Sequence, residues 1–192
     1  MDKRSQLRTQ LKTRRNALSV SEQDLASSKV AKSLSENKKI KQANQIALYL
    51  SNDGELDTTA FIEWCWQEKK AVFLPVVHPF STGNLLFLQY KKNTELISNC
   101  YGILEPKLDV TKVCPLAELD VICTPLVAFD NTGARLGMGG GFYDRSLANW
   151  QQNKLFPIGL AHDCQQVEQV PIKSWDIPLP EIITPSKNFS FL

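Results

Sequence analysis

The sequence of 192 residues lacks several features that mark whole classes of protein. It has no run of about 18 apolar residues, so it predicts no transmembrane helix, and its opening segment MDKRSQLRTQ has no apolar stretch of a secretory signal. It has only two histidines, and its five cysteines form no C-x-x-C pair, which disfavours a zinc site or a disulfide framework. No long apolar stripe suggests an obligate dimer. We therefore expect a cytoplasmic, monomeric protein with reduced cysteines that binds no membrane.

Charge is distributed unevenly along the chain, although the net charge is only +2. Residues 1–45 hold eleven Lys and Arg against four Asp and Glu, whereas residues 46–192 hold eleven against sixteen. Within the basic part, Arg4, Arg8, Lys12 and Arg15 recur at helical spacing and form one cationic stripe. This stripe could face an anionic ligand or could be the solvated face of a helical hairpin.

Apolar runs alternate with helical patterns, and this alternation predicts an α/β fold. We expect one domain over residues 1–192, with an N-terminal helical hairpin over 1–45 and an α/β core over 46–192. The core is expected to be a three-layer α/β/α sandwich around a mainly parallel sheet. Helices are predicted over 3–18, from the capping box Ser19–Glu22 onward, and over 58–69 and 142–152. Strands are predicted over 46–50, 71–77 with a break at Pro75, 85–90, 120–124, 156–161 and 181–184, and a loop over 102–106.

The segment 129–145, FDNTGARLGMGGGFYDR, carries five of the nine glycines together with two arginines and two aspartates. Glycines allow a backbone to expose its N–H groups and to approach a ligand closely, so this segment predicts a cradle for an anion. It is neither a Walker A motif nor a dinucleotide fingerprint, because no G-K-[ST] follows and the glycine spacing is wrong. A tight packing turn is the alternative, but such a turn would not need the flanking Arg135, Asp144 and Arg145.

The string RLGMGGGFYDR over 135–145 resembles the signature of the 5-formyltetrahydrofolate cyclo-ligase family, also called 5,10-methenyltetrahydrofolate synthetases. Further segments resemble that family in the same order along the chain. They are the opening R-x-x-x-L-R-x-x-L-K from Arg4, YLSNDGELDT over 49–58, GILEP over 102–106, PLVAFD over 125–130 and WDIPLPEIIT over 175–184. Two positions differ from the family pattern: Gly140 stands where a lysine is frequent, and Pro180 where an acidic residue is common.

The resemblance implies an enzyme that uses ATP and Mg²⁺ to close a ring in the small molecule 5-formyltetrahydrofolate, with no nucleic-acid partner. It implies three groups of site residues. The ATP contacts implied are Arg4, Ser5, Gln6, Leu7, Arg8, Arg135, Leu136, Gly137, Met138, Gly139, Gly140, Gly141, Phe142 and Tyr143. The folate contacts implied are Leu50, Glu55, Met138, Gly139, Gly140, Gly141 and Phe142. Asp144 and Asp176 would hold the metal, and Arg135, Tyr143 and Asp144 would serve catalysis.

The residues alone leave alternatives open. Tyr143 and Phe142 could be core aromatics, Glu55 a solvated loop acid, and Arg145 a partner of a nearby acid. His162, Asp163 and Glu105 could have structural roles. A phosphate-binding isomerase or transferase on a related scaffold is a second candidate function, although no lysine lies between residues 113 and 153 to serve it. A nucleotide- or RNA-binding module using the basic first 45 residues is a third, although no aromatics interleave with the four stripe cations.

Overall fold

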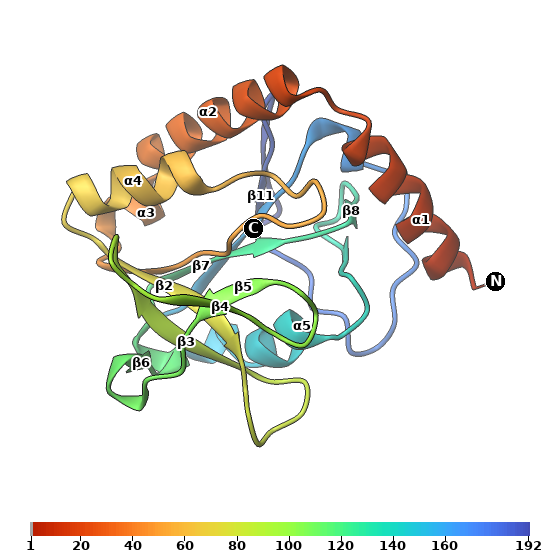
Figure 1. Cartoon of the computed structure of the whole chain (residues 1–192). Coiled ribbons are helices and arrows are strands. Elements are labelled where there is room, and N and C mark those ends of the chain that lie inside the picture. The colour runs from red at the N-terminus through yellow and green to blue at the C-terminus, as the bar shows by residue number, and fades with distance from the viewer. Residues whose placement is uncertain (1) are drawn as a thin grey trace.

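The structure, a computed structural model, describes residues 2–192 and is built around one eight-stranded sheet (Figure 1). In spatial order its strands are β12 (Asn188–Ser190), β11 (Glu181–Ile183), β10 (Phe156–Leu160), β7 (Val121–Pro125), β1 (Gln45–Ala47), β2 (Ala71–Val77), β3 (Leu85–Tyr90) and β6 (Val113–Cys114). The five strands from β11 to β2 are mutually parallel, and β12, β3 and β6 add antiparallel edges. The predicted, mainly parallel sheet is confirmed.

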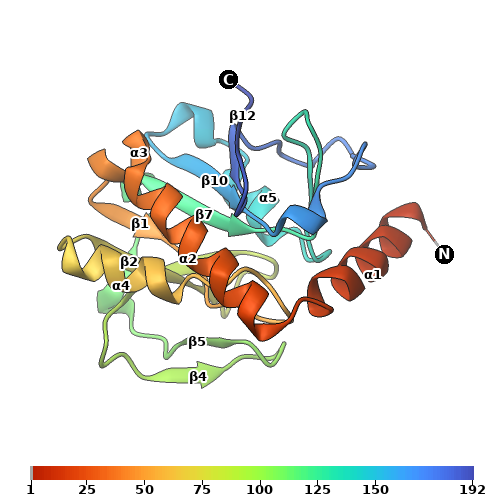
Figure 2. The same ribbon diagram turned by 90° about the horizontal axis from the view of Figure 1, so that it is seen from above.

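Helices cover both faces of this sheet, which confirms the expected layered sandwich (Figure 2). The helices are α1 (Lys3–Asn16), α2 (Val20–Glu36), α3 (Lys38–Gln42), α4 (Thr59–Gln67) and α5 (Phe142–Leu147). α2, α3 and α4 pack on one face, and α5 packs on the other. Among the helices of residues 2–192, none combines the length and apolar character needed to cross a bilayer.

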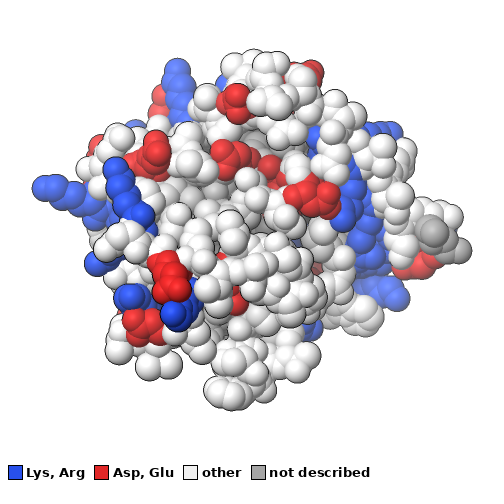
Figure 3. Space-filling view, viewed as in Figure 1, with Lys and Arg blue, Asp and Glu red and all other residues white. Residues whose placement is uncertain are grey.

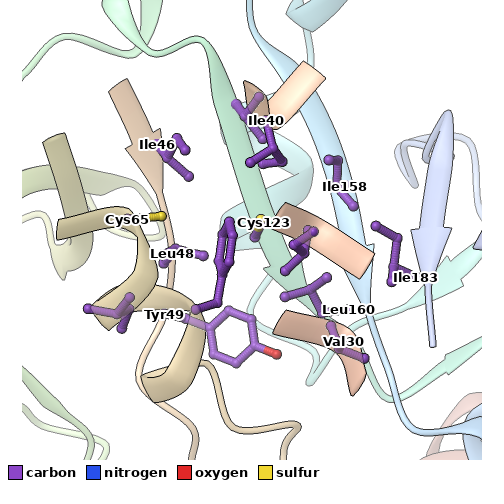
Figure 4. Close-up of a cluster of buried hydrophobic side chains, with 14 of the residues drawn as sticks. Val30, Ile40, Ile46, Leu48, Tyr49, Cys65, Cys123, Ile158, Leu160 and Ile183 are labelled. Carbon is purple, nitrogen blue, oxygen red and sulfur yellow. The ribbon is translucent and has the colours of Figure 1, made fainter. Parts of the chain in front are cut away.

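Successive side chains of the central strands enter the two opposite cores, as expected for a sheet buried on both faces. Ile46 and Ile183 join the cluster under α2 and α4, whereas Ala47 and Ile182 join the cluster under α5. Figure 4 shows the first cluster, in which Ile46, Cys123, Ile158 and Ile183 of the sheet, together with Leu48 just after β1, meet helical side chains. All five cysteines are free thiols, and three of them are buried.

The first two helices follow each other but pack on different neighbours. α2 begins at the predicted capping box, in which the Ser19 N–H donates to Glu22 and the Glu22 N–H donates to Ser19 Oγ. α2 packs on α4, whereas α1 buries Leu11 against Val127 and Leu136. α1 thus lies beside the carboxyl ends of the strands rather than over the sheet face (Figure 1).

Three sequence predictions of local structure were wrong. The loop expected over 102–106 contains β5 (Leu104–Pro106), which pairs with β4 (Leu96–Ser98) in a separate hairpin. Pro75 does not break its strand, because β1 pairs with β2 only as far as Phe73, so no backbone donor is needed on that side at Pro75. The helix expected over 142–152 ends at Leu147, and a separate 3₁₀ turn (Trp150–Gln152) packs Trp150 against Phe156.

Candidate active site

A cavity of about 590 Å³ opens at the carboxyl ends of β1, β2 and β7. β1 leads to β2 on one side, whereas its other neighbour β7 comes much later in the chain, so the strand order reverses between β1 and β7. Such switch points are where open α/β sheets bind ligands. The hairpin of β4 and β5 forms a further wall through Asn99, Tyr101, Ile103, Leu104 and Glu105.

Most of the predicted folate contacts line this cavity. Leu50 and Glu55 enter it from the loop after β1, and Met138, Gly140, Gly141 and Phe142 enter it from the glycine segment. Arg135, Tyr143 and Asp144 also line it. Gly139 does not line the cavity but lies on the other side of the loop, toward Arg8.

The glycine loop (Gly137–Gly141) leaves the short hairpin of β8 (Ala128–Phe129) and β9 (Arg135–Leu136) and ends where α5 begins. Gly139 and Gly141 have φ values of +116° and +67°, which residues with a side chain rarely adopt. Within residues 2–192, the backbone N–H groups of Gly137–Gly141 donate no hydrogen bond. The loop therefore presents a series of unused donors of the kind that bind anions.

The cationic stripe belongs to α1, over which Figure 3 shows a run of basic side chains, and its first half consists of Arg4 and Arg8. Arg8 Nε donates to the Gly137 carbonyl oxygen at 2.8 Å. Arg4 forms a bidentate pair with Asp176 and also donates to the Pro171 carbonyl oxygen at 2.8 Å. Burial opposes ionisation of Asp176, but the hydrogen bonds from Arg4 and from the Lys173 N–H (2.7 Å) bring the pKa of Asp176 below its usual range.

Arg135 and Asp144 form the second charged pair of the site. Arg135 is only 4% exposed, and its Nη2 donates to Asp144 Oδ1 at 2.8 Å. Its Nη1 donates to the Ile177 carbonyl oxygen, and the Ile177 N–H donates to Asp144 at 3.2 Å. Burial lowers the pKa of Arg135 while Asp144 and Asp176 oppose that change, so the guanidinium stays a fixed cation beside the loop.

The two predicted metal ligands meet around these arginines. Both Asp176 oxygens accept hydrogen bonds, whereas for Asp144 only Oδ1 accepts any from residues 2–192. Residues 2–192 hold no cluster of three or more His, Cys, Asp or Glu side chains of the kind that cages a metal. Mg²⁺ commonly binds through one or two carboxylates plus substrate phosphates, so this donor set fits Mg²⁺ better than a metal held by protein alone.

Aromatic side chains close the cavity near the glycine loop. Phe142 contacts the Tyr101 ring edge-to-face with centroids 5.9 Å apart, and the Arg145 guanidinium lies 5.8 Å from the Phe142 centroid. Arg145 also donates to the carbonyl oxygens of Gly83 and Gly140, so it fastens the loop to the turn after β2. Tyr143 is half-buried against the core under α5, and burial raises its pKa well above the usual value.

The two glutamates of the cavity wall, Glu105 and Glu55, differ in their hydrogen bonds. Glu105 is buried and accepts hydrogen bonds from the Val77 N–H (3.0 Å) and Asn99 Nδ2 (2.9 Å), so it joins β2 to the β4–β5 hairpin. Glu55 accepts one longer hydrogen bond, from the Asn52 N–H at 3.2 Å. Burial raises the pKa of Glu55 to about 7, against the opposing charge of Arg15. Glu55 is thus an under-partnered acceptor that faces the cavity.

Some residues singled out from the sequence are not brought to the cavity. Leu7 packs against the cluster around Leu11. Ser5 and Gln6 lie on α1 outside the cavity lining. His162 is buried outside the lining, and Asp163 accepts a hydrogen bond from Ser186 Oγ at 2.6 Å.

Several residues that line the cavity were not among the predicted folate, ATP or metal contacts, notably Lys12, Asn52, Asp53 and Tyr101. Lys12 belongs to the cationic stripe, so its spacing from Arg8 was the available signal. The other three lie on loops or hairpin turns whose place depends on the folded chain.

Comparisons with known proteins identify relatives over almost the whole chain. Residues 1–185 match the model of the 5-formyltetrahydrofolate cyclo-ligase family. The chain is 54% identical over 177 residues to the 5-formyltetrahydrofolate cyclo-ligase of Escherichia coli K12, covering 92% of this chain and 97% of that protein. It is 50% identical to the Haemophilus influenzae protein of the same name, covering 94% and 97% respectively.

Solved structures agree with this result. The 5,10-methenyltetrahydrofolate synthetase of Aquifex aeolicus has a TM-score of 0.83 and 30% identity, covering 98% of this chain and 92% of that one. The synthetase of Mycoplasma pneumoniae, at 24% identity and a TM-score of 0.75, shares the fold over 96% and 99% of the two chains. With its cavity at the strand ends and its glycine loop, this chain belongs to the 5-formyltetrahydrofolate cyclo-ligase family.

Proposed function

We propose that the protein converts 5-formyltetrahydrofolate to 5,10-methenyltetrahydrofolate in a reaction that depends on Mg²⁺ and turns ATP into ADP and phosphate. The names of its relatives support the folate reaction. The residues of the site support the need for ATP and Mg²⁺ and the path of the reaction.

One observation carries the proposal: the glycine loop separates two half-sites of different chemistry. On one side lies the cavity, whose wall includes Leu50, Glu55 and Phe142 and suits a flat heteroaromatic ring with a polar edge. On the other side lies Arg8, whose guanidinium is close to the loop backbone, and Arg4 follows one turn earlier on α1, where it is paired with Asp176. A loop with unused N–H donors between these half-sites is suited to hold phosphate oxygens beside a folate.

The proposed chemistry solves a problem of leaving groups. The oxygen of a formamide is a poor leaving group. In the proposed first step, the formyl oxygen attacks the terminal phosphorus of ATP, so that a new O–P bond forms and the bond from that phosphorus to ADP breaks. N10 of the same folate then attacks the formyl carbon and loses its proton, and the C–O bond breaks to release phosphate. Because this attack is intramolecular, alignment alone can supply a large share of about 7–11 kcal/mol.

The residues of the site match that demand for alignment and charge. The loop N–H groups and Arg135 would stabilise the oxygens of the transferring group, and Glu55 would accept the paired donors of the pterin edge. Asp144 and Asp176 would hold Mg²⁺, which supplies charge neutralisation on the phosphates. Phe142 would lie against the pterin ring, and Tyr143 would back the loop from α5.

The test is to mix the purified protein with MgATP and 5-formyltetrahydrofolate and to follow the absorbance of the methenyl product. Product is expected only when ATP and Mg²⁺ are both present, with one ADP formed per methenyl group. Product formed equally well without ATP would refute the phosphoryl-transfer path. Absence of product in the complete mixture would refute the proposed function as a whole.

A further inference from the structure

The second half of the cationic stripe contacts a different segment from the first half. Lys12 Nζ lies 2.6 Å from Asp53 Oδ2, and Asn16 Nδ2 donates to Asp53 Oδ1 at 2.9 Å. Arg15 Nε donates to the Asp53 carbonyl oxygen at 2.8 Å. The last turns of α1 therefore bind Asp53 through its carbonyl oxygen and through both of its carboxylate oxygens.

Asp53 and Gly54 form a turn in an uncommon backbone conformation. Their φ values are +51° and +73°, and a residue other than glycine seldom adopts the first of these. A Cβ at Gly54 would lie 2.0 Å from Asn16 Oδ1 and 3.5 Å from Arg15 Cγ, so α1 packs directly against this turn. The next residue is Glu55, whose N–H donates back to the Asn52 carbonyl oxygen at 3.0 Å. The conformation of the turn therefore fixes where the Glu55 side chain enters the cavity.

Arg15 is the unusual member of this group because its charge is fully buried. Its side chain is 0% exposed, and within residues 2–192 neither Nη1 nor Nη2 has a hydrogen-bond partner. Its one ionic partner among the described residues, Asp53 Oδ2, lies 3.6 Å from Nη2. A buried guanidinium with unsatisfied N–H groups costs stability, and an apolar residue of similar size is often at least as stable. Folding alone therefore gives no reason for a cation at this position.

We propose that Arg15 is a positioning residue of the cyclo-ligase reaction, which acts through the Asp53–Gly54 turn to hold Glu55 in the folate half of the cavity. This inference rests on the proposed contact between Glu55 and the folate. Arg15 does not line the cavity itself, so it acts on the substrate only through the turn and through its charge.

The electrostatics of Glu55 support this role. Burial raises the pKa of Glu55, and Arg15 is the largest influence that opposes the rise. The charged and titratable groups around Glu55 are Arg15 and Lys12 of α1, Asp53 of the same loop, Tyr49 after β1 and Tyr143 of α5. Of these groups, only Arg15 and Lys12 are cations that favour the carboxylate, and Lys12 is the weaker influence. Without Arg15, a larger fraction of Glu55 would be neutral near pH 7.

The test compares Arg15→Met, Arg15→Lys and, as a matched control, Arg14→Met, which removes an exposed cation one position away on the same helix. Steady-state kinetics would give kcat and separate KM values for folate and ATP between pH 5.5 and 9. For R15M we expect an unchanged or higher melting temperature and a folate KM raised about tenfold at pH 7, the effect of one lost hydrogen bond to a charged group. We also expect its KM for ATP to stay within about twofold of the wild-type value. The acid limb of kcat/KM for folate should move up by about one pH unit.

Arg15→Lys keeps the positive charge but loses the planar guanidinium. It should therefore raise the folate KM severalfold without moving the acid limb of the pH profile of kcat/KM for folate. R14M should match the wild type in every measurement. The inference is overturned if R15M keeps the wild-type folate KM and acid limb, or if both KM values rise together as after a general structural loss. If R15M does not fold, R15K decides alone, and a wild-type folate KM in that variant overturns the inference.

Glu55→Gln separates this inference from the function on which it rests. If E55Q has a wild-type folate KM, the proposed contact between Glu55 and folate is wrong, whatever Arg15 does. If E55Q raises the folate KM but R15M does not, only the role of Arg15 is wrong.

Discussion

Replacing Glu55 by glutamine should make the free protein more stable at alkaline pH, even though it removes a proposed folate contact. The carboxyl group sits in the cavity wall, where burial raises its pKa from 4.5 to about 7. Glutamine has the same shape and keeps an oxygen that can accept the Asn52 N–H. The change therefore removes an ionisable group with little change in packing.

The sign and size of the effect follow from linkage. Because the folded-state pKa is above the unfolded-state value, the unfolded protein releases this proton first as pH rises. The stabilisation is complete below pH 4.5, decreases between pH 4.5 and about 7, and is lost above that range. A difference of 2.5 pKa units, at about 1.4 kcal/mol each, corresponds to about 3 kcal/mol. E55Q should not show this loss.

The assay is urea denaturation of the wild type and E55Q, without ligands, at pH 4.5, 6 and 8. The difference in unfolding free energy between the two proteins should change by about 3 kcal/mol in favour of E55Q between the lowest and highest pH. Any pH-independent cost of the buried amide cancels in that comparison. A difference that stays constant across the range would show that Glu55 ionises normally and that burial does not raise its pKa.

Three further predictions concern the glycine loop and its partners. Asp144→Asn should lower kcat by on the order of 100-fold. Its melting temperature should stay within a few degrees of the wild type, because asparagine keeps the oxygen that accepts the hydrogen bond from Arg135. Full activity would remove Asp144 from the proposed metal site. Gly139→Val should weaken ATP binding, measured by calorimetry, at least about tenfold. A β-branched residue at the Gly139 φ of +116° costs about 1–3 kcal/mol of backbone strain. Tight binding of ATP by this variant would show that the glycine loop does not bind the phosphates. Gly140→Ala would place a Cβ 2.6 Å from the Phe142 ring and so displace that ring. The lost contact between Phe142 and the pterin should raise the folate KM about 2- to 12-fold. An unchanged KM would show that Phe142 does not contact the pterin.

The elements that the sequence predicted are those whose signal is local. β2 and β7 are runs of apolar residues, and α2 starts at a capping box whose two hydrogen bonds form as expected. The strands that were not predicted, among them β4, β5 and β8, are two or three residues long and form by pairing with a neighbouring strand. So few residues carry no periodicity, and only tertiary contact determines that they pair.

The candidate site divides in the same way. The glycine loop could be predicted because its composition and its flanking charges lie within 17 residues. The contacts between α1 and Asp53 could not be predicted, because they join residues 37 to 41 positions apart in the sequence. They also depend on a turn whose φ values cannot be read from a sequence pattern. The stripe of four cations was visible in the sequence, but nothing in its spacing indicated that its two halves contact different loops.

The charges of the site also differ in how far they are already neutralised. Arg4 is paired with Asp176, Arg135 with Asp144, and Lys12 with Asp53. Arg8 instead donates to a neutral partner, the Gly137 carbonyl oxygen. Burial and the neighbouring Arg4 lower the pKa of Arg8, so an anion bound beside it would favour its charged form. On the proposed function, the paired arginines are held in place by their carboxylates, and Arg8 offers a triphosphate a cation without a carboxylate partner on the nucleotide side of the glycine loop.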